Sequence, residues 1–194
     1  MRLTLLLDLD DTLMTNNMRT FLPAYFESLS AVLLAYAQPQ PLIQHLLAAT
    51  DKMTANDQPN RTLKEAFDAA FYPALGKTAD DLQPELERFY AEDFPKLERV
   101  IKRRPAAIAL VQEAFRRGYR VAVTTNPLFP RPAILHRLAW AGLPADEYPF
   151  ELITSYESFH FTKPRPAYFA EALGRLGWPE GPVVVVGDDL ENDI

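Results

Sequence analysis

The first apolar run of the chain reads Leu3-Thr-Leu-Leu-Leu-Asp8-Leu-Asp10-Asp11-Thr12, which predicts a buried strand ending in carboxylates. A second such run, Val183-Val-Val-Val-Gly187, leads into Asp188-Asp189-Leu-Glu-Asn-Asp193, so that these two segments hold six of the thirteen aspartates. If the two strands are parallel neighbours, their carboxyl ends bring four or more carboxylates together. Carboxylates that close cannot all stay ionised without a cation, and hard oxygen ligands beside a substrate phosphate suit Mg²⁺. The two runs therefore predict a Mg²⁺ site built from both ends of the chain.

A helical module is predicted directly after the first strand. Residues 19–92 contain no strand pattern, and apolar residues spaced by three and four over 22–36 predict one face of a helix. A second short helix is expected over 42–49. The segment Thr62-Leu-Lys-Glu65 has the capping-box spacing and opens a third helix, and Pro84 can start a fourth.

Strands and helices alternate in the remainder of the chain. The expected elements are a helix from Pro105 to Gly118, a strand over 120–125, a helix around 133–141, a strand over 150–154, a helix from Pro164 and the strand over 183–186. Such alternation indicates βαβ units and a mostly parallel sheet covered on both faces. We therefore expect an α/β core formed by 1–14 and 98–194, interrupted by an all-helical cap over 15–97, and we interpret the basic stretch 99–104 as a solvated linker.

The composition limits the possible functions. The chain has 194 residues, enough for one core and a smaller module, and its net charge of -6 argues against a nucleic-acid partner. The absence of cysteine excludes disulfides, thiolate metal sites and thiol catalysis. The first apolar stretch is too short for a secretory signal, and no segment reaches membrane-spanning length. We expect a cytoplasmic protein without a membrane partner, and its oligomeric state stays open.

Polar residues follow each predicted strand at the end where ligands gather in parallel sheets. They are Asp8 with Asp10, Thr125 with Asn126, Lys163, and Asp188 with Asp193. Each set has a structural alternative: the aspartates could be solvated turns, Thr125 a helix cap, and Lys163 a surface lysine. Their coincidence at four strand ends is what favours a catalytic site.

Each of these residue types can perform a different part of the reaction. One carboxylate of Asp8 and Asp10 can attack a phosphorus or carbon centre while the other donates and later removes a proton. The Thr125 hydroxyl and the following Asn126 amide could hold an oxyanion. Lys163 precedes a proline and a helix start, a place suited to anions. Asp188 is the natural metal ligand, and Asp193 could bind metal directly or orient Lys163.

The ordered set closely resembles the four motifs of the haloacid dehalogenase superfamily of hydrolases across residues 3–193. The matching segments are Asp8-x-Asp10-x-Thr12, Thr125-Asn126, Lys163-Pro164, and Gly187-Asp188 with Asp193. The resemblance implies a Rossmann-like core with a C1-type helical cap, Asp8 as phosphoryl acceptor and Asp10 as general acid and base. It also implies Mg²⁺ held by Asp8, the Asp10 backbone carbonyl and Asp188, with Asp193 close by, and phosphoryl oxygens held by Thr125 and Lys163.

The expected function is that of a Mg²⁺-dependent phosphatase acting on a small phosphorylated metabolite through an aspartyl-phosphate on Asp8. One alternative is a dehalogenase, which needs no Mg²⁺ and generally lacks the second aspartate of the first motif. Another is a non-catalytic interaction protein with the same fold. His160 and the 56–61 loop are further positions to inspect for substrate contact. Superfamily members usually continue past the last motif, whereas this sequence stops at Ile194, and we expect Asp193 to be poorly anchored if nothing follows it.

Overall fold

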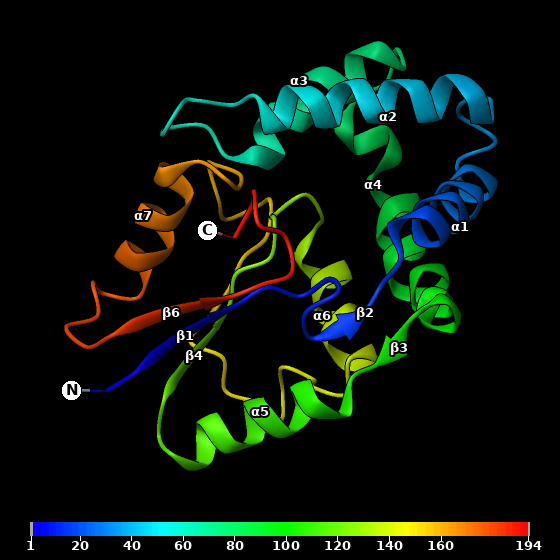
Figure 1. The fold of residues 1–194 in the computed structure, drawn as a ribbon. Coiled ribbons are helices and arrows are strands. Elements are labelled where there is room, and N and C mark those ends of the chain that lie inside the picture. Colours follow the sequence, from blue (N-terminus) through cyan, green and yellow to red (C-terminus); the bar gives the residue numbers. More distant parts are fainter. Residues whose placement is uncertain (1, 194) are drawn as a thin grey trace.

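The computed structural model describes residues 2–193 and contains a four-stranded parallel sheet in the order β5-β4-β1-β6 (Figure 1). The strands are β1 (Thr4–Leu7), β4 (Arg120–Val123), β5 (Leu152–Ile153) and β6 (Val183–Val186). Strand β1 pairs in parallel with both β4 and β6, and Leu7 stands opposite Val123 and Val186. The prediction that the first and last strands are parallel neighbours is therefore confirmed.

Helices cover both faces of the sheet because alternate residues of β1 point to opposite sides. Leu5 and Leu7 pack in one cluster with residues of α5 (Pro105–Arg116) and α6 (Arg131–Trp140). Leu6 packs instead with Leu176, next to α7 (Pro166–Arg175). The result is the expected α/β architecture of a Rossmann-like core.

The structure corrects three details of the predicted core. Strand β6 is an edge strand, and Val183 and Val184 are 37% and 43% exposed instead of buried. Helix α7 begins at Pro166 and not at Pro164, and β4 ends at Val123, two residues early. A run of valines predicts a strand, but it does not show whether the strand has neighbours on both sides. An edge strand such as β6 has only one neighbour, so its side chains are less buried.

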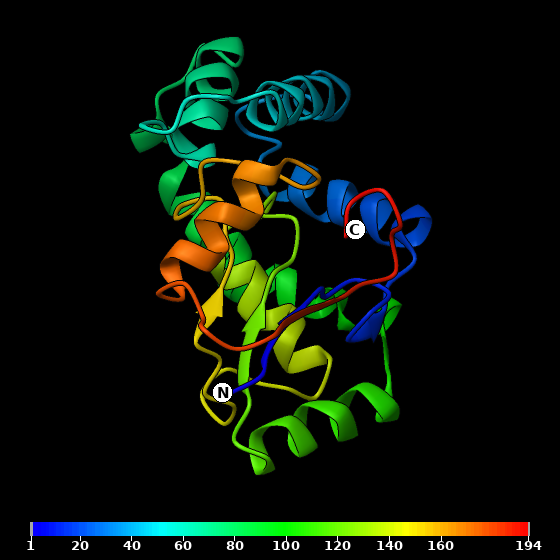
Figure 2. The ribbon, with the colours of Figure 1, turned by 60° about the vertical axis from the view of Figure 1, so that its left-hand side comes forward.

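The cap consists of four α-helices. They are α1 (Met18–Val32), α2 (Pro39–Thr54), α3 (Leu63–Ala74) and α4 (Ala79–Arg88), followed by a π-helical turn (Phe89–Asp93) and a 3-10 helix (Phe94–Val100). Helices α2 and α3 (cyan to teal) lie above the core in the view of Figure 2, and α1 (dark blue) lies beside it. The capping box at Thr62 is present, but α2 is longer than expected. The predicted start at Pro84 is wrong, because Thr78 and Asp81 form a capping box that opens α4 earlier.

A short antiparallel ribbon joins the cap to the core. Strand β2 (Met14–Thr15) pairs with β3 (Lys102–Arg103), where the chain leaves the core and returns to it. The basic stretch 99–104 is thus not only a solvated linker, since it contributes a strand. The boundaries at 14/15 and 97/98 stay a prediction. None of the helices within residues 2–193 combines the length and the apolar character needed to cross a membrane.

Aromatic packing holds one side of the cap against the core. The ring of Phe94 stacks on Trp140 of α6 with their centroids 5.2 Å apart, and Phe21 of α1 meets Phe94 edge to face. All three side chains are buried in one cluster. The cap and the core therefore share a continuous apolar interior near α6.

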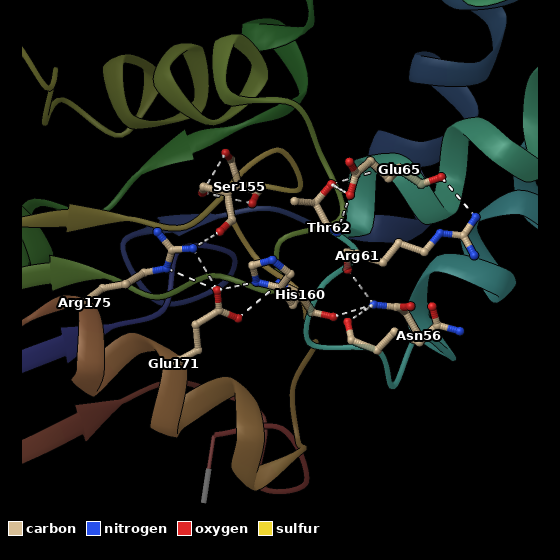
Figure 3. A network of polar contacts seen from close by, with 10 residues as sticks. Asn56, Arg61, Thr62, Glu65, Ser155, His160, Glu171 and Arg175 are labelled. Atoms are coloured by element: carbon tan, nitrogen blue, oxygen red, sulfur yellow. Dashed lines mark hydrogen bonds and ion pairs between the residues drawn. The ribbon is translucent and has the colours of Figure 1, made fainter.

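Polar contacts hold the other side of the cap, in a group that we call the Asn56 clasp: cap residues 55–64 bound to core residues 156–160 (Figure 3). The buried Asn56 side chain donates hydrogen bonds to the carbonyls of Arg61 and His160, both at 2.9 Å. The amide of Leu63 donates to the Phe159 carbonyl at 2.8 Å. The 56–61 loop is thus fixed to the core.

The His160 ring belongs to the core side of the clasp and not to a substrate site. Its Nδ1 lies 2.8 Å from Oε1 of Glu171, and its backbone amide donates to the other oxygen of the same carboxylate at 3.0 Å (Figure 3). Arg175 pairs with Glu171 as well, at 2.9 Å. These contacts hold the segment that accepts the Asn56 bond, so His160 has a structural role.

We expect Asn56→Ala to lower the free energy of unfolding by about 2 kcal/mol, because carbonyls that accept from a buried amide lose their donor. Amide hydrogen exchange over 55–64 should accelerate, while exchange in β1 and β4 changes only through the global stability. Asn60→Ala, at an exposed position of the same loop, is the matched control and should alter neither quantity. Equal effects of the two variants would contradict the role of the clasp.

Candidate active site

A cavity of about 280 Å³ lies at the carboxyl ends of the strands. Six of the residues singled out in the sequence line it: Asp8, Asp10, Thr125, Asn126, Lys163 and Asp188. The cavity is also lined by Met18 at the start of α1, so the cap contributes to its wall. The tertiary fold thus brings the predicted residues from four strand ends into one place.

Lys163 is a buried cation between two aspartates from opposite ends of the chain. Its Nζ lies 2.9 Å from Oδ1 of Asp8 and 2.5 Å from Oδ1 of Asp193, and its side chain is 1% exposed. The backbone amide of Lys163 donates to Oδ1 of Asn126 at 3.3 Å, which links it to the loop after β4. The surface-lysine interpretation is therefore wrong.

Asp8 lies in an environment that opposes its ionisation. Burial raises its pKa from the ordinary 3.8 to about 6, even though the adjacent Lys163 ammonium acts in the opposite direction. Asp193 and Asp10 repel the Asp8 charge and add to the rise. Asp8, Asp188 and Asp193 together carry more negative charge than the single Lys163 ammonium offsets.

Three carboxylates offer oxygens that all lie within 4.8 Å of one another: those of Asp8, Asp188 and Asp193. Burial raises the pKa of Asp188, and the nearby Asp11 and Asp193 charges add to this. Clustered oxygen donors with excess negative charge fit a hard divalent cation such as Mg²⁺. The group is a candidate metal site, and Asp193 also contacts Lys163, so both roles considered for it are compatible with its position.

The Asp10 side chain lies outside this acidic group and is bound from the other side. Arg137 of α6 forms an ion pair with Oδ2 of Asp10, and Asn16 donates to Oδ1 at 2.6 Å. The Asp10 backbone carbonyl as a metal ligand stays a prediction. Asp8 and Asp10 are thus directed to different partners, as an acceptor and a proton donor require.

Arg137 lines the active-site cavity and is a residue of the site that the sequence interpretation missed. Its side chain is 1% exposed, and its guanidinium lies over the rings of Phe21 and Phe129, 5.6 Å and 5.2 Å from their centroids. The signal was available, because helical spacing places Arg137 on the same face as Ile134 and Leu138, and a charged residue on a buried face needs a charged partner.

Thr125 is buried and lies two residues after the end of β4. Its backbone carbonyl accepts hydrogen bonds from the hydroxyls of Thr154 at 2.7 Å and Tyr168 at 2.9 Å. These two bonds fix the backbone from which the Thr125 side chain and the Asn126 amide extend into the cavity. The contact of the Thr125 hydroxyl with an oxyanion stays a prediction.

Asp193 is firmly held, contrary to the expectation that it would be poorly anchored. It is 5% exposed, its amide donates to the Asp189 carbonyl at 2.9 Å, and its Oδ2 accepts from the Asp189 amide at 3.2 Å. Its carboxylate lies directly against Gly187, where a Cβ would come within 2.0 Å of Oδ2. The glycine after the valine run therefore makes room for this carboxylate.

We expect Gly187→Ala to displace the Asp193 carboxylate and to lower the turnover rate at least about 100-fold, because small misplacements of a catalytic group have effects of that size. Gly174→Ala is the matched control, since a Cβ there meets only the Trp178 ring at 3.8 Å. Thermal unfolding of both variants shows whether the folded state survives. If Gly187→Ala kept the activity of the natural chain, the site would not depend on Asp193 as a metal ligand or as the partner of Lys163.

Comparisons with known proteins identify the family of the chain. The family model described as haloacid dehalogenase-like hydrolase matches residues 3–194. No curated protein sequence matches the chain.

Solved structures share the fold. CbbY from Rhodobacter sphaeroides in complex with phosphate is 23% identical with a TM-score of 0.55, over 98% of this chain and 80% of that one. A HAD phosphatase from Thermococcus onnurineus is 23% identical with a TM-score of 0.55, over 100% and 80%. The HAD-hydrolase YfnB from Bacillus subtilis bound to magnesium is 22% identical with a TM-score of 0.51, over 100% and 81%.

Proposed function

Because the chain belongs to the haloacid dehalogenase-like hydrolases, we propose that it is a Mg²⁺-dependent phosphatase of a small phosphorylated metabolite. The observation that carries the proposal is the meeting of Asp8, Lys163 and Asp193, with Nζ of the lysine 2.9 Å and 2.5 Å from the two carboxylates. A buried cation beside a buried carboxylate can receive a phosphate dianion next to a nucleophile. A cytoplasmic location stays an expectation.

Asp8 is the proposed nucleophile. Its carboxylate attacks phosphorus, the bond from phosphorus to the ester oxygen breaks, and an aspartyl-phosphate forms on Asp8. Lys163 and the Asn126 amide hold phosphoryl oxygens while charge shifts onto them, and the Thr125 hydroxyl adds a hydrogen bond. The contact of Lys163 with Asp8 in the free protein supports this, because the lysine already stands where the phosphoryl group has to arrive.

Asp10 is the proposed general acid and base. It gives a proton to the departing ester oxygen and then takes one from the water that hydrolyses the aspartyl-phosphate. The bonds from Arg137 and Asn16 support this role, because they hold the carboxylate in one orientation away from the acidic group. The presence of Asp10 is also the feature that argues against the dehalogenase alternative.

The carboxylates of Asp8, Asp188 and Asp193 are the proposed Mg²⁺ ligands. When bound, the ion would offset the repulsion between the substrate dianion and Asp8. Lys163 supplies the other positive charge, and Asp193 keeps it oriented.

The test is phosphate release from a panel of phosphomonoesters by the purified chain, with Mg²⁺ and after treatment with a chelator. We expect turnover with Mg²⁺, a loss of at least about 100-fold on chelation, and recovery when Mg²⁺ is restored, because the excess negative charge of the site otherwise repels the substrate. Turnover that is indifferent to the chelator contradicts the metal dependence. Metal-independent halide release from a haloacid would favour the dehalogenase alternative, and inactivity on the whole panel would favour the interaction protein.

A further inference from the structure

A second cavity, of about 200 Å³, lies in the cap where it meets the core, next to the active-site cavity. Its wall comes from α1, α2, α3 and α4, from the start of the π-helical turn, from the 128–130 segment and from Tyr156, and it contains no charged side chain. Leu22, Leu29, Leu46, Phe67 and Phe71 are typical of this wall. Pockets of this composition bind apolar groups, and an apolar cavity of about 150 Å³ is large enough to take up benzene.

The two cavities adjoin, because Leu128 and Phe129 line both of them. Their shared wall lies close to the residue that holds Asp10, the proposed proton donor to the leaving group. Arg137 binds Asp10, and its guanidinium lies 5.2 Å from the Phe129 centroid. The ring of Phe129 in turn meets Tyr25 of the cap cavity edge to face at 5.5 Å. A phosphomonoester bound at Lys163 with its ester oxygen toward Asp10 therefore directs its alcohol part toward this cavity.

Five hydroxyl groups lie in the wall, and three of them are already engaged with protein groups; among residues 2–193 only those of Tyr72 and Tyr156 remain to meet a polar ligand. Tyr25 and Tyr90 share a hydrogen bond of 3.1 Å, and the Thr50 hydroxyl donates to a carbonyl of its own helix at 2.9 Å. Burial raises the pKa of Tyr25 to about 12, so its hydroxyl is neutral at physiological pH. A sugar or a polyol, which carries several hydroxyl groups, would lose more hydrogen bonds to water than these two tyrosines, Tyr72 and Tyr156, can replace.

We propose that this cavity is the leaving-group subsite and that the substrate is a phosphomonoester of an uncharged apolar alcohol, with an alkyl chain or aromatic ring about the size of a hexyl or phenyl group. This inference rests on the proposed phosphatase function. In this proposal the cap cavity recognises the apolar alcohol part of the substrate, and the core recognises its phosphate group.

The test compares methyl, propyl and hexyl phosphate, whose leaving alcohols have nearly the same basicity, and adds glycerol phosphate as the hydroxylated counterpart of propyl phosphate. We expect kcat/KM with Mg²⁺ to rise at least about 100-fold from methyl to hexyl phosphate, and glycerol phosphate to fall at least about tenfold below propyl phosphate. Phosphate release that is flat or decreasing along the alkyl series overturns the leaving-group subsite and leaves the phosphatase function standing. No release from any ester overturns both.

A pair of variants separates the cavity from the rest of the cap. Leu46→Trp fills the cavity, so the ratio of kcat/KM for hexyl over methyl phosphate should fall at least about tenfold. Leu34→Trp makes the same change at a position that is 54% exposed and outside the wall, and the ratio should stay as in the natural chain. An unchanged ratio in a folded Leu46→Trp overturns the assignment. The alkyl series on the natural chain decides the proposal by itself if Leu46→Trp does not fold.

Discussion

Asp8→Asn is expected to abolish phosphate release and, in metal-free solution near neutral pH, to make the protein more stable. The loss of turnover should reach at least about 10⁴-fold, because an amide cannot form the aspartyl-phosphate. The gain in stability follows from the environment of the carboxylate. The pKa of Asp8 rises from 3.8 to about 6 on folding, which corresponds to a cost on the order of 3 kcal/mol for burying the ionised form.

The sign of the pH dependence follows from the direction of this shift. Because the folded state binds the Asp8 proton more tightly than the unfolded state, the carboxyl favours folding fully only below about pH 4. That contribution is lost as the pH rises through about 6. The variant and the natural chain should therefore differ little near pH 4 and increasingly above it, reaching a difference in Tm of about 6 to 12 °C near pH 7.

Thermal unfolding in chelator across this pH range checks the prediction. Asp146→Asn, at an exposed position, is the control and should show no such pH-dependent gain. Mg²⁺ should raise the Tm of the natural chain more than that of Asp8→Asn, because the variant lacks one anionic ligand. A variant that is less stable than the natural chain at every pH would show that the carboxylate stabilises the fold, contrary to this account.

The Arg137→Met variant is expected to lose activity in a manner that depends on the leaving group. Asp10 would no longer be held where it can protonate the ester oxygen, and general acid catalysis contributes about 10²- to 10⁴-fold. Alkyl phosphates need that proton, so their kcat should fall at least about 100-fold. For 4-nitrophenyl phosphate, whose leaving group is a stable anion, the loss should stay below about tenfold.

The dependence on leaving group separates a positioning role from a merely structural one. Removing a buried charge also lowers the stability of the protein, by up to about 3 to 5 kcal/mol when a buried partner is left unpaired. Thermal unfolding measures this part, and activities are compared below the transition. Arg137→Lys keeps a cation near Asp10 and should restore part of the alkyl phosphate activity. Equal losses for both kinds of ester would rule out the positioning of Asp10.

Elements whose causes are local could be predicted from the sequence. The valine run and the leucine run identified β6 and β1, and the Thr62 capping box identified the start of α3. Carboxylates directly after such strands predicted an acidic group at this edge, because parallel neighbours end at the same edge of the sheet. Three carboxylates meet there instead of the four or more expected, since the Asp10 side chain turns to Arg137. The family resemblance rested on the same positions. Errors of the local kind, such as the start of α4, arose where two signals competed within a few residues.

Contacts that join distant parts of the chain could not be predicted from the sequence and became visible only in the folded molecule. Arg137 meets Asp10 across 127 positions, and Asn56 meets His160 across 104. Periodicity and capping depend on neighbours within about one helical turn, so they carry no information about which partner a buried charge will find. The exposed edge of β6 and the cap cavity could not be predicted for the same reason. Exposure and empty space depend on how separate elements pack against one another, and the sequence of any one element does not contain that arrangement.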